Sequence, residues 1–315
     1  MSSLEAIGIL SIGEMGLGIA QLLIAHNYRV LTYASDRSEA TQKRAWSAGI
    51  ELRPSMQDLV DQSDVLLSIV PPRDARLTAE RVIAASSARP AVRDTPLWYV
   101  DLNAVSPQTA REIETLFTAA GSHLRFIDGG IVGGPPRELP ADESRDQPAW
   151  HCPSLLVSGP EKLPDDVLAQ TLNIKHLADR IGVATGLKMC FASLTKGFFS
   201  LAIQSFTTAH ALGVLPDLRA LMEEYNPQAL KMAERGVVGM PSKAYRWVGE
   251  MKEIGDTFRE DGGFDSDLFY AVAQVYQSVA DDPVLGLEKP GDRKRGQTVE
   301  DVVECLNKSL KVKTE

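Results

Sequence analysis

Hydrophobic positions in the first 180 or so residues fall in short runs, separated by polar and glycine-containing turns. Short apolar runs bounded by turns are typical of strands buried within a sheet, and the longer stretches between them have helical spacing. The expected strands are Ile7–Ile12, Tyr28–Tyr33, Asp64–Val70, Leu97–Leu102, Leu124–Asp128 and Ser154–Pro160, which we expect to be the last. This alternation predicts an α/β domain with a parallel sheet.

The pattern changes from about Gly182, where strand signals end and helical periodicity continues to the C-terminus. The first of these helices, Ala184–Leu212, has too much apolar surface for an exposed helix, so we expect it to be buried between domains or subunits. We therefore predict an α/β Rossmann-type N-terminal domain, residues 1–181, followed by an all-α C-terminal domain, residues 182–315. We expect the helical domain to bind substrate and to form a homodimer, because C2 pairing is the commonest way to bury such a surface.

A glycine-containing turn follows the first predicted strand. It matches the G-x-G-x-x-G fingerprint at its second and third glycines, while Ser11 replaces the first glycine and must adopt a conformation that glycine adopts more easily. Such a turn directs backbone N–H groups and a helix N-terminus toward a pyrophosphate. The expected dinucleotide-binding residues are Ser11, Ile12, Gly13, Glu14, Met15 and Gly16. The alternative is an ordinary strand–helix turn without a ligand.

The segment after the second predicted strand contains residues suited to the adenosine ribose of NAD and residues suited to that of NADP. Asp36 lies about 20 residues after the last glycine of the turn, the spacing of the acid that binds the 2′-OH of NAD. Arg37 and Ser38, with Lys43 and Arg44 nearby, form a cationic and hydroxyl-bearing group that favours the 2′-phosphate of NADP. We expect NADP as cofactor, with NAD as the alternative.

Two further segments follow strands at the edge of the sheet where ligands bind. Val70, Pro71 and Pro72 form a loop that the prolines make rigid. Asn103 follows the next strand, and its amide can donate a hydrogen bond to a cofactor or substrate oxygen.

Composition narrows the class of protein. The chain has 315 residues, 44% hydrophobic and 24% charged, which is enough for two globular domains. A formal net charge of -9 argues against nucleic-acid binding. No apolar run is long enough for a bilayer, so we expect a cytoplasmic protein with a small-molecule substrate and no membrane partner. Three cysteines without paired spacing predict neither a metal site nor a disulfide framework.

Five segments, in order, resemble the β-hydroxyacid dehydrogenase superfamily, which includes 6-phosphogluconate and 3-hydroxyisobutyrate dehydrogenases. They are Gly8–Gly16 for G-x-I-G-x-G-x-M-G, Asp101–Pro107 for D-x-S-T-x-x-P, Gly129–Gly134 for P-V-S-G-G, Gly182–Lys188 for G-x-G-x-x-x-K, and Lys252-Glu253 for K-D. The segments Ser68–Pro72, Leu187–Gly197 and Arg246–Ile254 are most similar to a 6-phosphogluconate dehydrogenase-like subgroup with a poorly characterised C-terminal domain.

The resemblance implies an NAD(P)-dependent oxidoreductase acting on a small hydroxy acid or carbonyl compound, with Lys188 as general acid/base. Apolar neighbours and a helix start would both lower the pKa of this amine toward neutrality, where proton donation is efficient. The resemblance also implies that Val132, Gly133 and Gly134 bind substrate and that Lys252 approaches the cofactor.

The chain departs from the family's pattern where polar groups hold the substrate. Val132 replaces a serine, Phe191 an asparagine, and Asn103-Ala104 a Ser-Thr pair. We therefore expect Phe191 and Val132 to border a less polar substrate. Thr195, two helical turns beyond Lys188, is a further candidate for substrate contact. For Lys196, Glu250 and Glu253, roles in the site and in an ordinary charged helix face remain open.

Two alternative functions remain. Imine reductases use a related scaffold but generally lack the catalytic lysine, so Lys188 opposes this function while Val132 and Phe191 favour it. A non-catalytic cofactor-binding protein is the other alternative, supported by Ser11 and the altered substrate residues.

Overall fold

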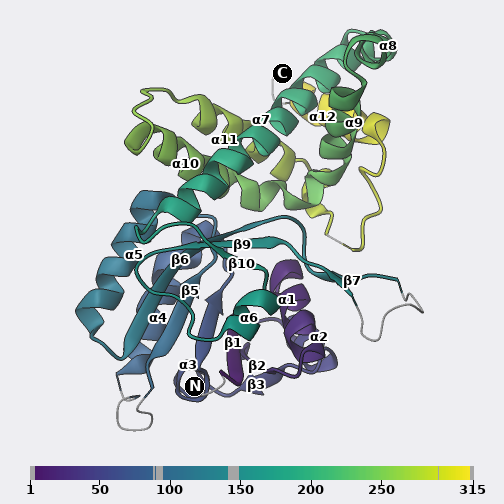
Figure 1. The fold of residues 1–315 in the computed structure, drawn as a ribbon. Helices are drawn as coiled ribbons and strands as arrows, with labels where there is room; N and C mark the ends of the chain where they lie inside the picture. The colour runs from purple at the N-terminus through teal and green to yellow at the C-terminus, as the bar shows by residue number, and fades with distance from the viewer. Residues whose placement is uncertain (1–3, 88, 90–94, 141–148, 290, 313–315) are drawn as a thin grey trace. The chain divides into compact units, whose positions relative to one another are not determined.

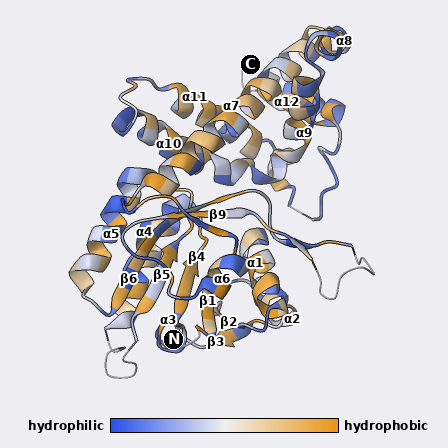
Figure 2. Ribbon diagram, in the orientation of Figure 1, coloured by the Kyte–Doolittle hydropathy of each residue, from blue (hydrophilic) through white to orange (hydrophobic). Residues whose placement is uncertain are grey.

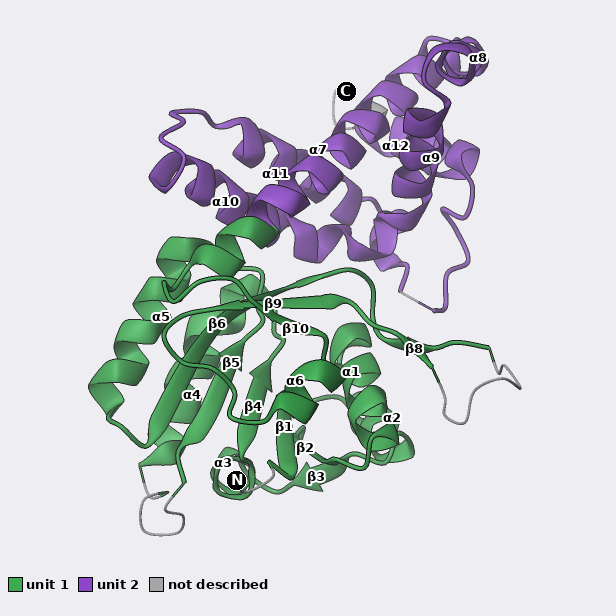
Figure 3. Cartoon of the chain, in the orientation of Figure 1, with its two compact units in different colours: residues 1–188 green, residues 189–315 purple. Residues whose placement is uncertain are grey.

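The structure, a computed structural model, describes residues 4–87, 89, 95–140, 149–289 and 291–312 (Figure 1). The chain forms two compact units, residues 1–188 and residues 189–315 (Figure 3). The first contains a mainly parallel sheet with helices and the second contains helices, which confirms the predicted fold class. The division of function after residue 181 remains a prediction.

An eight-stranded sheet forms the centre of the first unit, in the order β10-β9-β6-β5-β4-β1-β2-β3. Its strands are β1 (Ala6–Leu10), β2 (Arg29–Tyr33), β3 (Glu51–Arg53), β4 (Val65–Ser68), β5 (Leu97–Asp101), β6 (Leu124–Val132), β9 (Ser154–Ser158) and β10 (Ile174–His176). β6 and β9 pair antiparallel, and the other neighbours in the sheet pair parallel.

Two sequence predictions about these strands were wrong. β9 is not the last strand, because β10 pairs with it at the sheet edge. β10 has three residues, of which only Ile174 is aliphatic, so it left no apolar run in the sequence. β6 also extends past Asp128 to Val132, since the glycines there pair with β9.

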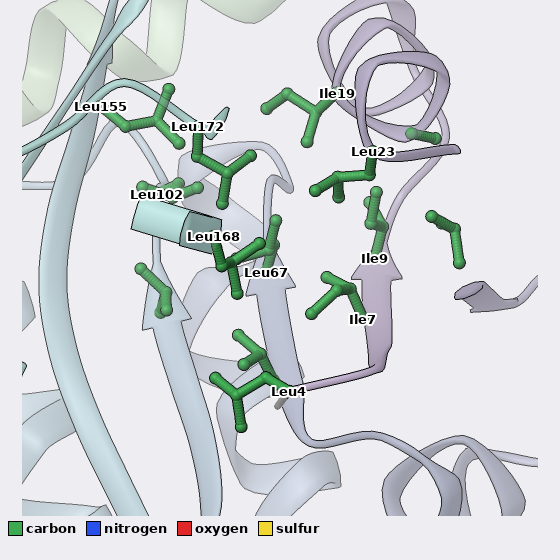
Figure 4. Packing of buried hydrophobic residues seen from close by; sticks show 14 of the residues in the cluster. Leu4, Ile7, Ile9, Ile19, Leu23, Leu67, Leu102, Leu155, Leu168 and Leu172 are labelled. Carbon is green, nitrogen blue, oxygen red and sulfur yellow. The ribbon is translucent and has the colours of Figure 1, made fainter. Parts of the chain in front are cut away.

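Helices cover both faces of the sheet. α1 (Glu14–Ala25), α2 (Glu39–Ser47) and α6 (Asp166–Thr171) contribute to the core on one face, and α3 (Met56–Gln62), α4 (Pro72–Ser86) and α5 (Pro107–Ala120) to the core on the other. Alternation along β1 sends Ile7 and Ile9 into the first core and Ala6 and Leu10 into the second. Figure 4 shows members of the first core from β1, β4, α1 and α6, and Figure 2 shows the hydrophobic character of the strands.

A separate pair of short strands, β7 (Arg137–Glu138) and β8 (Trp150–His151), occupies part of the segment predicted as a polar excursion. Residues 141–148 of that segment lie outside the described residues.

Helix α7 (Val183–Ala211) begins in the first unit and continues into the second. The second unit also contains α8 (Leu215–Tyr225), α9 (Pro227–Gly239), α10 (Ala244–Glu260), α11 (Leu268–Ala280) and α12 (Val299–Val312), with 3₁₀ turns at Pro241–Lys243 and Leu285–Leu287. Aromatic packing joins three of these helices: the ring centroids of Trp247 and Tyr276 are 5.3 Å apart, edge to face, and Phe199 stacks on Trp247 at 6.3 Å. Within the described ranges, every helix is too short or too polar to traverse a bilayer.

Candidate cofactor and catalytic site

The sheet has a topological switch point at β1. β2 lies on one side of β1 and β4 on the other, and the helices that follow β1 and β4 pack on opposite faces of the sheet. In open α/β sheets a crevice forms outside the carboxyl ends of the strands at such a point, and ligands bind there. Here the turn after β1 and the loop after β4 meet, joined by a 3.2 Å hydrogen bond from the Ile69 N–H to the Leu10 carbonyl.

The turn after β1 has the backbone that a phosphate-binding turn requires. Ser11 has a φ of +80°, in the left-handed region, as expected for the position of the first fingerprint glycine. A Cβ on Gly16 would lie 2.2 Å from the Ser11 carbonyl oxygen, so only glycine fits there. At Gly13, immediately before α1, an added Cβ would meet no atom within 4 Å, which leaves the helix N-terminus open to a ligand.

The remaining residues of the predicted turn have different surroundings. Ile12 is buried in the core between the sheet and helices α1, α2 and α6, and Met15 packs against that core while partly exposed. Glu14 is exposed at the first position of α1.

A pocket of about 200 Å³, partly open to solvent, adjoins this turn. Nine residues line it: Ser11, Ile12, Gly13, Thr32, Tyr33, Ala34, Arg37, Thr41 and Arg44. Arg44 ties α2 to the turn, since its Nη2 donates to the Ile12 carbonyl oxygen at 3.1 Å. Ser38 caps α2 by accepting a hydrogen bond from the Thr41 N–H at 3.4 Å. Sequence reasoning missed Thr41 and the end of β2, although their place beside Arg37 was a signal.

Asp36 and Lys43, by contrast, are not among the nine described residues that line the pocket. The Asp36 carboxylate pairs with Arg81 of α4, at 3.3 Å from Nη2, and with the Nε of Arg37, at 3.4 Å. Lys43 is exposed and lies 4.0 Å from Glu39.

The loop after β4 is held by Asn103. Its Oδ1 accepts a hydrogen bond from the Val70 N–H at 2.7 Å, and its Nδ2 donates to the Ser68 Oγ at 3.0 Å. The residue is 1% exposed, and it connects the end of β5 to the loop that leads into Pro71 and Pro72. Contact between Asn103 and a ligand remains a prediction.

Lys188 is buried in the first part of α7, at 8% exposure. Its side chain crosses the backbone of β6 at Gly130, where an added Cβ would lie 2.8 Å from the lysine Cβ and 3.1 Å from its Cγ. The position is therefore available to Lys188 because residue 130 has no side chain. Val132 is two residues further along the same strand, so its side chain is on the same face of β6 as this contact.

The N-terminus of α7 is fixed by Asp128, which is fully buried. The Gly182 N–H donates to its Oδ2 at 2.8 Å, the Ser158 Oγ donates to the same oxygen at 2.6 Å, and the Thr185 hydroxyl donates to Oδ1. The Ala184 N–H donates to the Ser158 Oγ at 2.9 Å. A carboxylate that accepts from the first N–H groups of a helix satisfies donors that lack intrahelical partners and suits the positive end of the dipole.

A second buried carboxyl group, Asp101, lies at the end of β5. Its Oδ1 accepts from the Asn103 N–H at 2.9 Å, whereas its Oδ2 is buried without a hydrogen-bond partner among the described residues. Burial raises the pKa of Asp101 to about 7, and Asp128 adds to this, while Asn103 and Lys188 act in the opposite direction. Lys188 and Asp101 therefore interact electrostatically. Neither Asp101 nor Asp128 was recognised from the sequence as a site residue.

The other substrate candidates of the first unit follow β6. Gly133 has a φ of +124°, and an added Cβ would lie 3.1 Å from the Cα of Pro153. Gly134 comes next and is exposed. Val132, at the end of the strand, is paired with Ser154.

The remaining candidates belong to the second unit. Phe191 is exposed on α7, the Thr195 hydroxyl donates to the Phe191 carbonyl oxygen at 3.2 Å, and Lys252 is exposed on α10. Their contacts with cofactor or substrate remain predictions.

Lys196 and Glu250 form an ion pair inside the second unit, between α7 and α10. The Lys196 Nζ also lies 5.0 Å from the ring centroid of Trp247. These contacts give both residues a structural role there. Among the described residues, no three His, Cys, Asp or Glu side chains gather as a metal site would require.

The fold and the open turn at the switch point define a nucleotide-binding class of protein, and the residues present fit a dinucleotide. Residues 6–141 match the family model described as "NAD binding domain of 6-phosphogluconate dehydrogenase", and residues 209–279 match "Domain of unknown function (DUF1932)". The chain thus carries the NAD-binding domain of the 6-phosphogluconate dehydrogenase family followed by a domain of the second family, which confirms the resemblance seen in the sequence.

Sequence identity between this chain and individual relatives is low. An uncharacterized 28.5 kDa protein of Methanothermus fervidus is 26% identical over 250 residues, 79% of this chain and 88% of the relative. The 3-hydroxyisobutyrate dehydrogenase of Mycobacterium tuberculosis, solved with L-serine, is 16% identical with a TM-score of 0.65, covering 96% of this chain and 99% of that one. An imine reductase variant of Myxococcus stipitatus, in complex with NAD+, is 15% identical with a TM-score of 0.51. The match covers 97% of this chain and 99% of the reductase. At these identities the two solved structures show a shared fold.

Proposed function

We propose that this protein is an NADPH-dependent oxidoreductase that reduces the carbonyl group of a small substrate, or oxidises the corresponding hydroxy acid. The observation that carries the proposal is the buried Lys188, whose side chain lies against Gly130 and which interacts with Asp101 at the end of β5. β5 and β1 run parallel in one sheet, so the end of β5 and the nucleotide-binding turn are on the same edge.

The chemistry divides between cofactor and protein. When bound, the nicotinamide supplies a hydride for the carbonyl carbon. The carbonyl oxygen then needs a proton, and the Lys188 ammonium donates it; in the oxidation direction the neutral amine accepts it. General acid catalysis of this kind is worth about 10²–10⁴-fold in rate. Asp128 fixes the start of α7 and so orients Lys188.

The pocket beside β2 supports NADPH as the preferred cofactor. Arg37, Arg44 and the Thr41 hydroxyl line it, and these are the cations and donors that a phosphate group requires. The 2′-OH of NADH would instead need Asp36, whose carboxylate is paired with Arg81 and Arg37.

The first test is a titration of the purified protein with NADPH and with NADH, following nicotinamide fluorescence. We expect NADPH to bind at least about tenfold more tightly, because the phosphate gains charge-assisted hydrogen bonds. Tighter binding of NADH would assign the ribose to Asp36. Failure of both nucleotides to bind would refute the proposed function.

Lys188→Ala tests the catalytic role. We expect unchanged nucleotide affinity and a turnover reduced about 10²–10⁴-fold on any substrate found in a carbonyl screen. Thr195→Ala on the same helix serves as a comparison for loss of a substrate contact, with KM expected to change more than kcat. Full turnover by Lys188→Ala would contradict the assignment.

Imine reduction is the second candidate. Apolar Val132 and Phe191 at positions where the family pattern has polar residues favour it, and Lys188 favours carbonyl chemistry. The substrate screen should therefore include cyclic imines alongside hydroxy acids and their carbonyl forms. Tight NADPH binding with no turnover in either group would indicate a non-catalytic nucleotide-binding protein.

A further inference from the structure

We propose that Arg81 of α4 determines the cofactor preference by engaging Asp36, so that the acid does not bind the adenosine ribose. This proposal rests on the proposed function as a dinucleotide-dependent enzyme. It assigns the choice between NADPH and NADH to a residue far from the glycine turn in sequence, in addition to the cations that line the phosphate pocket.

Both oxygens of Asp36 are engaged by guanidinium groups. Oδ2 accepts from the Arg81 Nη1 at 3.4 Å and Nη2 at 3.3 Å, while Oδ1 lies 3.4 Å from the Arg37 Nε. An acid that selects NADH has to offer its oxygens to the ribose hydroxyls. Asp36 stands at the position for that task, but its carboxylate is already occupied.

Arg81 is held in place by the elements around it. Its helix, α4, is anchored in the core through Ala79 and Val82 on either side of it. The guanidinium carbon lies 5.9 Å from the ring centroid of Tyr33, the last residue of β2, within the range of a cation–π contact. Tyr33 also lines the pocket, so Arg81 lies next to the wall of the candidate ribose site.

The charge balance then favours a phosphate. A carboxylate beside the pocket would repel the 2′-phosphate of NADPH, and the positive charge of Arg81 compensates it. Loss of Arg81 would leave Asp36 with Arg37 alone. Arg37 would be shared between the acid and the phosphate, and Asp36 would become available to the ribose diol of NADH.

Arg81→Met in the full chain tests this directly, because methionine keeps an unbranched apolar stem and removes the charge. Fluorescence titrations should show the ratio of NADH to NADPH dissociation constants falling by about tenfold or more. The matched control is Arg76→Met on the same helix, which removes a cation paired with Glu80 and Glu112 and should leave the ratio unchanged.

Two further variants separate the proposed effect from damage to the fold. Asp36→Asn in the Arg81→Met background should restore the wild-type ratio, which a structural defect would not do. Asp36→Asn alone should change the ratio by no more than about twofold, because Arg81 already compensates the charge of this carboxylate in the wild-type protein.

An unchanged ratio in Arg81→Met, with both nucleotides still binding, would overturn the inference and leave the proposed function standing. A ratio that Asp36→Asn fails to restore would also overturn it. Failure of the wild-type protein to bind either nucleotide would refute the proposed function itself.

Discussion

Asp101 is a buried carboxyl group with an incomplete set of hydrogen bonds, and this has a consequence for stability. Burial raises its pKa from 3.8 to about 7 in the folded protein. Between these values the folded state holds a proton that the unfolded state has released, so the free energy of unfolding falls as pH rises and levels off above about pH 7.

Asp101→Asn removes this titration and keeps an acceptor for the Asn103 N–H. We expect the melting temperature of the wild type, measured relative to the variant, to fall from about pH 5 to about pH 7 and then to stay constant. Asp265→Asn, at an exposed position, is the control for loss of one negative charge. Parallel pH profiles for wild type and Asp101→Asn would contradict this prediction.

At the residue scale, features that depend on neighbouring residues in the chain were predictable from the sequence. Ser11 was expected to adopt a glycine-like conformation and has a φ of +80°. The roles of Asp128 were not predictable, because the groups that bond to it come from positions 30 and 54 residues away. Nothing in a single sequence marks such partners before the fold brings them together.

At the scale of elements, the start of α7 depends on one carboxylate. Asp128 accepts from Gly182, Ser158 and Thr185, all of them buried. In Asp128→Asn, an amide NH₂ would face donors, and we expect the free energy of unfolding in urea to fall by about 2–4 kcal/mol.

Ser106→Ala provides the matched comparison, because Ser106 caps α5 by accepting from the Thr109 N–H at 3.1 Å. Loss of an ordinary cap costs about 1 kcal/mol. If Asp128→Asn were no more destabilising than Ser106→Ala, the Asp128 network would not have the role described.

Elements with strong periodicity were predicted, and short ones were missed. The long helices and the apolar strands had clear signals in the sequence. β3 and β10 have three residues each, and α6 has six, so none is long enough to establish a hydrophobic period. They exist because packing at the edges and face of the sheet stabilises them.

At the scale of the whole molecule, the exposed face of α7 supports the predicted homodimer. Phe191, Leu194 and Leu201 are 53%, 77% and 60% exposed, and they recur at near-heptad spacing. Light scattering should give a mass of about twice the 34.3 kDa of the chain.

Leu194→Glu with Leu201→Glu should yield a monomer, because burial of these charges at an interface is unfavourable. Leu77→Glu, at an exposed position on α4, should remain dimeric. A wild-type protein of monomeric mass at micromolar concentration would contradict the prediction of a dimer.

The class of protein was predictable from the order of its motifs, whereas the substrate was not. The residues that would specify it, Val132 and Phe191, are those that depart from the family's pattern. Specificity depends on the shape and polarity of a complete pocket, and one sequence does not give that shape.

The bare backbone at Gly130 also limits how this protein can be altered by mutation. Any replacement would bring a side chain against the stem of Lys188, so libraries aimed at new substrates should leave codon 130 unchanged. Codon 132 is the better position to vary in such libraries. Val132 lies on the same face of β6, two residues from Gly130, so side chains introduced there would change that face without replacing the glycine that Lys188 needs.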